Sequence, residues 1–75
     1  MSLNDSIFQT LRGSYLTAVR DMALYPDNHP AHHDAERMAA SASNTAFAVL
    51  GHGAAEALRK EGLQEWERIR GYALA

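Results

Sequence analysis

The chain has 75 residues, of which 47% are hydrophobic and 21% are charged, and its formal net charge is −2. This composition is too hydrophobic and too weakly charged for a disordered chain, and no run of about eighteen apolar residues is present to span a membrane. The length predicts one domain over residues 1–75, and the lack of cysteine excludes a disulfide framework. The first residues lack the pattern of a secretory signal, so we expect a cytoplasmic protein.

The first helix is predicted to begin near residue 5, where Asn4, Asp5 and Ser6 are each suitable caps. Pro26 disfavours the helical conformation of the residue before it, so this helix ends by Tyr25. Hydrophobic residues recur between these limits at helical spacing and form one stripe, which we expect to enter the core. The stripe consists of Ile7, Phe8, Leu11, Tyr15, Ala18, Val19, Met22 and Tyr25.

A second, longer helix is predicted to start at Pro30, with Asn28 or His29 as its cap. Mostly small residues follow on one narrow stripe, which lets a neighbouring helix approach closely. These residues are Ala35, Ala39, Ala42, Ala46, Val49, Leu50, Gly53 and Ala57.

Gly62 marks the predicted end of the second helix, because it follows basic residues and is typical of the left-handed position that closes a helix. Two glycines at 51–53 predict an earlier kink or close contact, since each costs about 1 kcal/mol in a helix interior. Hydrophobic residues in the remaining segment, 63–75, share one side and predict a short third helix.

Strand patterns are missing from the sequence, so the predicted fold class is all-α. The first two helices would form a helical hairpin of two long antiparallel helices, with the short C-terminal helix folded back on them. A chain of this length buries only about 60% of the surface that it exposes when unfolded. We therefore expect a second copy to complete the core, giving a homodimeric bundle.

The interface is predicted on three kinds of side chain. Leucines lie off the hydrophobic stripe of the first helix, small residues allow close approach on the second, and aromatic and arginine residues gather near the C-terminus. The predicted interface residues are Leu16, Leu24, Ala42, Ala46, Trp66, Arg68, Arg70 and Tyr72.

Three histidines and a carboxylate lie close together in the turn before the second helix and in its first residues: His29, His32, His33 and Asp34. Imidazole and carboxylate groups at this spacing are plausible zinc or nickel ligands. The same residue types are also ordinary at a turn and a helix start, and the common helical zinc motif is absent. We expect no native metal and no cofactor, and a metal-binding protein remains an alternative.

Basic residues near the C-terminus offer another alternative, a small dimeric DNA-binding transcription regulator that contacts phosphates. These residues are Arg59, Lys60, Arg68 and Arg70. Four glutamates in the same stretch cancel their charge, and the whole chain lacks the basic excess that phosphate binding favours. Nucleic acid is therefore not the expected partner.

Side chains arranged for catalysis are not evident, so no enzyme is predicted. Ser41, Ser43 and Thr45 lie in an alanine-rich helix, where small polar residues usually act as packing spacers, and neither a concave site nor a positioned partner can be inferred for His52. In size and composition the chain resembles the small helical inhibitors and adaptors that phages and bacteria encode. The sequence thus predicts a dimeric protein-binding module, acting on a host or regulatory protein as inhibitor or adaptor.

Overall fold

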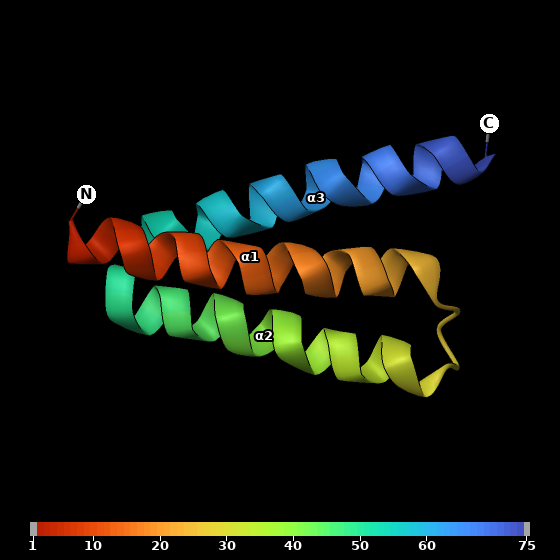
Figure 1. Cartoon of the computed structure of the whole chain (residues 1–75), viewed down its shortest axis with the longest axis horizontal. Coiled ribbons are helices and arrows are strands. Elements are labelled where there is room, and N and C mark those ends of the chain that lie inside the picture. The colour runs from red at the N-terminus through yellow and green to blue at the C-terminus, as the bar shows by residue number, and fades with distance from the viewer. Residues whose placement is uncertain (1, 75) are drawn as a thin grey trace.

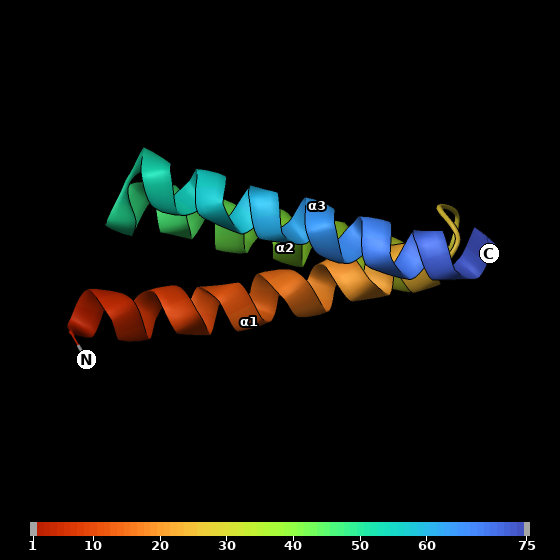
Figure 2. The same cartoon turned by 90° about the horizontal axis from the view of Figure 1, so that it is seen from above.

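A computed structural model describes the backbone of residues 2–74 and the side chains of residues 2–71. Three helices account for nearly all of it: α1 (Leu3–Leu24), α2 (Pro30–Leu50) and α3 (His52–Leu74). Helix α2 runs back along α1, and α3 then runs in the direction of α1, so that the three form a bundle (Figures 1 and 2). Each helix contacts the other two. The all-α class is confirmed.

Local sequence signals explain how the first two helices start. Ser2 caps α1, because its hydroxyl accepts a hydrogen bond from the Asp5 N–H at 3.2 Å while the Asp5 carboxylate accepts one from the Ser2 N–H. This pair starts α1 two residues earlier than predicted. Pro30 is the first residue of α2, and the ring of His29 accepts a hydrogen bond from the Ala31 N–H, which confirms the predicted cap.

Gly51 separates α2 from α3, so the prediction that the second helix continues to residue 61 is wrong. Its backbone angles, φ 98° and ψ 179°, lie in a region that is essentially restricted to glycine. The Gly51 N–H closes α2 by donating to the carbonyls of Ala46 and Phe47. The third helix has 23 residues, so the expectation of a short one is also wrong.

Gly62 lies inside α3 and not at the end of a helix. Its role is in the packing of α3 against α1. It is buried, and a Cβ atom built on it would collide with the ring of Tyr15 on α1. The missing side chain lets α3 approach α1 at this point. Helix closure and close packing both favour glycine, and the sequence pattern does not distinguish them.

The core between α1 and α2 is made mainly of small side chains. Ala18, Ala35 and Ala39 are buried together, and Tyr15 and Met22 pack against them. The alanine stripe of α2 therefore has its close neighbour within the same chain, namely α1.

Polar contacts join α1 to α3. Arg12 pairs with Glu61 at 2.8 Å, and Arg20 pairs with Glu65 at 3.0 Å. Glu65 is also held by Arg68, which lies on its own helix. Hydrogen bonds from Arg68 and then Arg20 lower the pKa of Glu65 from its ordinary 4.5 to about 2.

Candidate interaction face

Two shallow hollows lie along α1 and α2. The first has a volume of about 220 Å³ and the second about 240 Å³. Leu11 lines both of them, so they form one continuous surface, which we call the interaction face. Its residues are Ser6, Ile7, Thr10, Leu11 and Ser14 on α1, and Met38, Ser41, Ala42 and Thr45 on α2.

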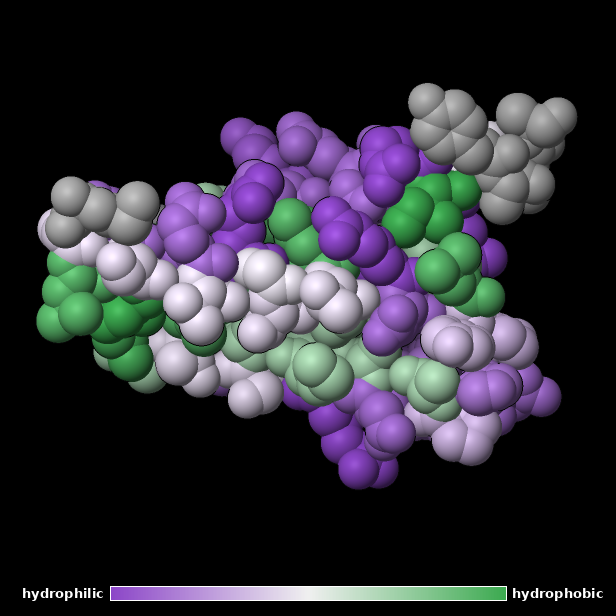
Figure 3. Space-filling model, in the orientation of Figure 1, coloured by the Kyte–Doolittle hydropathy of each residue, from purple (hydrophilic) through white to green (hydrophobic). Residues whose placement is uncertain are grey.

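None of these nine residues carries a charge, and the sequence spacing explains why they share a side. Ile7, Thr10 and Ser14 are separated by three and four residues, as are Met38, Ser41 and Thr45, and such residues lie on one side of a helix. Figure 3 shows the result as a band of intermediate and hydrophobic surface that crosses the molecule between hydrophilic groups. In this view strongly hydrophobic surface lies at the end where α1 begins and α2 ends, and again towards the opposite end of the molecule beside α3.

Three of the predicted interface residues are buried inside the single chain and have almost no surface for a partner. Leu16 is 7% exposed, Ala42 is 5% exposed and Ala46 is fully buried. Burial within the single chain leaves Leu16 and Ala46 almost without surface for a partner, whereas Ala42 contributes to the lining of a hollow and so to the interaction face. Leu24, by contrast, is 69% exposed.

The predicted interface residues near the C-terminus lie on α3, so they do not join the interaction face. Trp66 is half-buried, and the guanidinium of Arg70 lies 4.7 Å from the centre of its ring. Arg68 is bound to Glu65. Tyr72 lies outside the residues whose side chains the structure describes.

The histidine cluster serves the turn between α1 and α2 and does not form a metal centre. His29 caps α2 and stacks on Tyr25, His33 and Asp34 are exposed, and His32 is buried. Nowhere in the described part of the chain do three His, Cys, Asp or Glu side chains gather so that they could hold a metal ion. The alternative of a metal site on these four residues is therefore not supported.

His32 is the buried polar side chain of the described residues, and acceptors surround it. Its Nδ1 lies 3.1 Å from the carbonyl oxygen of Met22 and 3.2 Å from that of Tyr25, at the end of α1. Its Nε2 lies 2.9 Å from the Glu36 carboxylate and 3.7 Å from that of Asp27. The ring thus bonds carbonyls that the end of α1 leaves without helical partners, and it fixes the turn.

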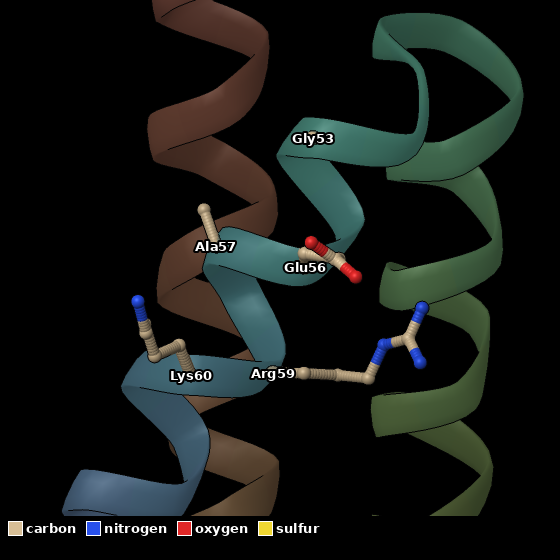
Figure 4. Close-up of a pocket in the computed structure, with 5 residues that line it drawn as sticks. All are labelled: Gly53, Glu56, Ala57, Arg59 and Lys60. Atoms are coloured by element: carbon tan, nitrogen blue, oxygen red, sulfur yellow. The ribbon is translucent and has the colours of Figure 1, made fainter.

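A third hollow, of about 530 Å³, lies on α3 beside the other helices and carries mixed charge (Figure 4). Arg59 and Lys60 line it together with Glu56, and Figure 4 shows the two basic side chains pointing away from one another. His52 pairs with Glu56 at 3.0 Å. The basic groups do not converge on one position, which weakens the alternative of phosphate binding.

Comparison of the chain with protein-family models, with curated proteins and with solved structures finds no match. Within the described residues, none of the helices combines the length and the apolar character needed to cross a membrane.

Proposed function

We propose that this chain is a non-enzymatic protein-interaction module of the inhibitor or adaptor kind, and that the interaction face on α1 and α2 is its working surface. The observation that carries the proposal is the lack of charge on a hollowed face that two helices share. Burying a charged side chain carries a large desolvation penalty, whereas small hydroxyl-bearing side chains can enter an interface at little cost if they are hydrogen-bonded.

One hydroxyl group of the face is already hydrogen-bonded within the chain. The Thr10 hydroxyl donates to the Ser6 carbonyl of the preceding turn at 3.0 Å, so it needs no bond from a partner. Small side chains at Ser14, Ser41 and Ala42 let another helix approach near the short end of the usual 8 to 10 Å range. A helix of a protein partner is therefore the ligand that the face fits best.

A photoreactive phenylalanine analogue at Ser41 tests this function in the full chain. Ser41 is exposed and lines the face. On illumination we therefore expect the chain to become covalently joined to a protein partner, giving adducts of discrete mass. The matched control carries the same analogue at Gln64, an exposed position on α3. Equal labelling from both positions, or no adduct from Ser41, would contradict the proposal.

A further inference from the structure

We infer that the buried ring of His32 is a pH-sensitive clasp on the turn between α1 and α2. The clasp is closed when the ring carries two protons, and it opens when the ring loses one of them. His32 does not line the interaction face, so the clasp does not depend on the proposed function.

Each hydrogen-bonding or ion-pairing partner that the described residues offer the His32 ring is an acceptor. The carbonyl oxygens of Met22 and Tyr25 lie 3.1 and 3.2 Å from Nδ1. The carboxylates of Glu36 and Asp27 lie 2.9 and 3.7 Å from Nε2. A neutral imidazole has one N–H, so on one side it would turn a lone pair towards an acceptor. The imidazolium, with a proton on each nitrogen, donates to both sides.

Charged groups approach the ring from α2 and from the turn. Glu36 lies one helical turn after His32 on α2, and Asp27 belongs to the turn, so both carboxylates attract a positive ring. The ring of His33 lies edge-on, with 6.2 Å between the ring centres, and opposes this charge when it is itself protonated. The carbonyl end of α1 favours the charge and the N-terminal end of α2 opposes it. Within the described residues, no ion pair joins the ring to α3.

A second histidine and glutamate pair in the same chain shows what burial adds. His52 pairs with Glu56 at the same spacing of four residues, and the two side chains are 3.0 Å apart. The side chain of His52 is 67% exposed, whereas that of His32 is 8% exposed. Water can bond to the exposed ring in either protonation state, and solvent screens its ion pair. The buried ring depends on protein partners, so the loss of a proton costs it a hydrogen bond.

The surroundings of the two ring nitrogens decide which proton leaves. The Nδ1 proton is held by the carbonyls of Met22 and Tyr25, which are fixed in the backbone at the end of α1. The Nε2 proton faces Glu36, whose side chain is 53% exposed and can turn towards water. As the pH rises, the ring therefore loses the Nε2 proton and releases Glu36 and Asp27, while its bonds to α1 remain. The release of Asp27 separates the turn from the first residues of α2.

Nitrogen-15 NMR of the ring nitrogens tests the clasp in the full chain. Histidine in water titrates at about pH 6.5, so spectra at about pH 5.5 and about pH 8.5 sample the two states. We expect His32 to carry protons on both nitrogens at the lower value and on Nδ1 alone at the higher one. A ring that carries a single proton at both values, or that keeps its proton on Nε2 at the higher one, would overturn the inference.

Thermal unfolding at a series of pH values tests what the clasp contributes to stability. Glu36→Gln should remove the pH dependence, because the glutamine amide can accept from the charged ring and donate to Nε2 of the neutral one. The folded chain favours the protonated ring, so stability is present in mild acid and is lost as the pH rises. Between about pH 6 and about pH 8, the melting temperature of the unmodified chain should fall by roughly 5 °C relative to that of Glu36→Gln.

Glu56→Gln is the matched control, since it removes the same kind of pair at the exposed His52. It should leave the fall in melting temperature unchanged. His29 accepts a hydrogen bond from the Ala31 N–H and so responds to pH in the opposite sense, but all three chains contain it and its contribution cancels. Equal pH dependence of the unmodified and Glu36→Gln chains, or an equal effect of the two substitutions, would overturn the inference.

Discussion

Helix α1 holds its two neighbours by different means. Against α2 it packs small buried side chains, with Ala18 meeting Ala35 and Ala39. Against α3 it uses two ion pairs of Arg12 and Arg20, together with the close contact at Gly62. The contact with α2 depends on shape and apolar burial, whereas α3, whose Ala55 and Leu58 are also buried, adds charges that solvent and protons reach.

The two contacts should therefore respond to different changes. The contact of α1 with α2 should be sensitive to larger side chains, and the ion pairs between α1 and α3 should be sensitive to salt and pH. An alanine-rich contact has no room for larger side chains but is indifferent to salt and pH. Ion pairs near the surface tolerate changes of volume, but salt and acid weaken them. Four substitutions test these contacts.

The largest effect is expected from overpacking the buried alanine stripe of α2. Ala46 is fully buried, so Ala46→Leu forces the helices apart and should lower the free energy of unfolding by about 3 kcal/mol. Urea unfolding followed by circular dichroism measures the change. Ala48→Leu adds the same side chain at an exposed position of α2, where it should change stability by less than about 0.5 kcal/mol. Similar losses for the two variants would show that α2 is not packed as described.

Removing the buried imidazole should have the next largest effect. His32→Ala leaves the carbonyls of Met22 and Tyr25 without their hydrogen-bond donor and should cost about 2 kcal/mol. Thermal unfolding at constant pH gives the value. His33→Ala is the control, since the neighbouring ring is exposed, and it should leave stability nearly unchanged. Equal effects of the two substitutions would contradict the role assigned to His32.

Gly62→Ala is expected to have a smaller effect, because two contributions to the free energy of unfolding oppose each other. Alanine favours a helix interior over glycine by about 1 kcal/mol, but the new Cβ collides with Tyr15 and overpacking costs about 1 to 3 kcal/mol. The net result should be a loss of roughly 1 kcal/mol. In a Tyr15→Ala background the collision is removed, so the same substitution should stabilise the chain. A double-mutant cycle measures this reversal of sign, and its absence would rule out close packing at this point.

The smallest effect concerns the ionised Glu65. Since its folded pKa is lowered to about 2, the stability that it contributes is fully present above its ordinary 4.5 and is lost as the pH falls towards 2. Glu65→Gln should therefore lower the melting temperature at neutral pH. It should also flatten the acid limb, which is the fall of the melting temperature between pH 4.5 and about 2. Glu67→Gln, at an exposed position of the same helix, is the control and should leave the limb unchanged. Identical acid limbs for Glu65→Gln and the unmodified chain would contradict the ion pairs.

Local sequence signals were sufficient for some helix ends and not for others. Pro30 and His29 act through the backbone next to them, so the start of α2 could be predicted. The break at Gly51 lies where the two glycines predicted a kink, but the end of the helix was placed at Gly62, whose missing side chain makes room for Tyr15, a residue distant in the sequence. The helical class followed from the hydrophobic periodicity, whereas the role of Gly62 depended on a tertiary contact.

The candidate site was predicted only in part for a similar reason. A stripe of small residues looks the same whether the helix that covers it belongs to the same chain or to another, and here Ala35 and Ala39 pack with Ala18 of α1. Ile7 was placed in the core stripe and Met38 was not singled out, although both line the interaction face. Each of them lies three residues before another uncharged residue of the face, and this spacing could have identified them.

The single residue between α2 and α3 has a consequence for domain swapping. Gly51 adopts backbone angles that other residues avoid, and the helices on either side of it are ready to join. With alanine there, the favoured form is one continuous helix from Pro30 to Leu74, whose second half lies too far from its own α1 to pack on it. That half would pack on the α1 of another molecule, so one glycine keeps α3 within its own chain.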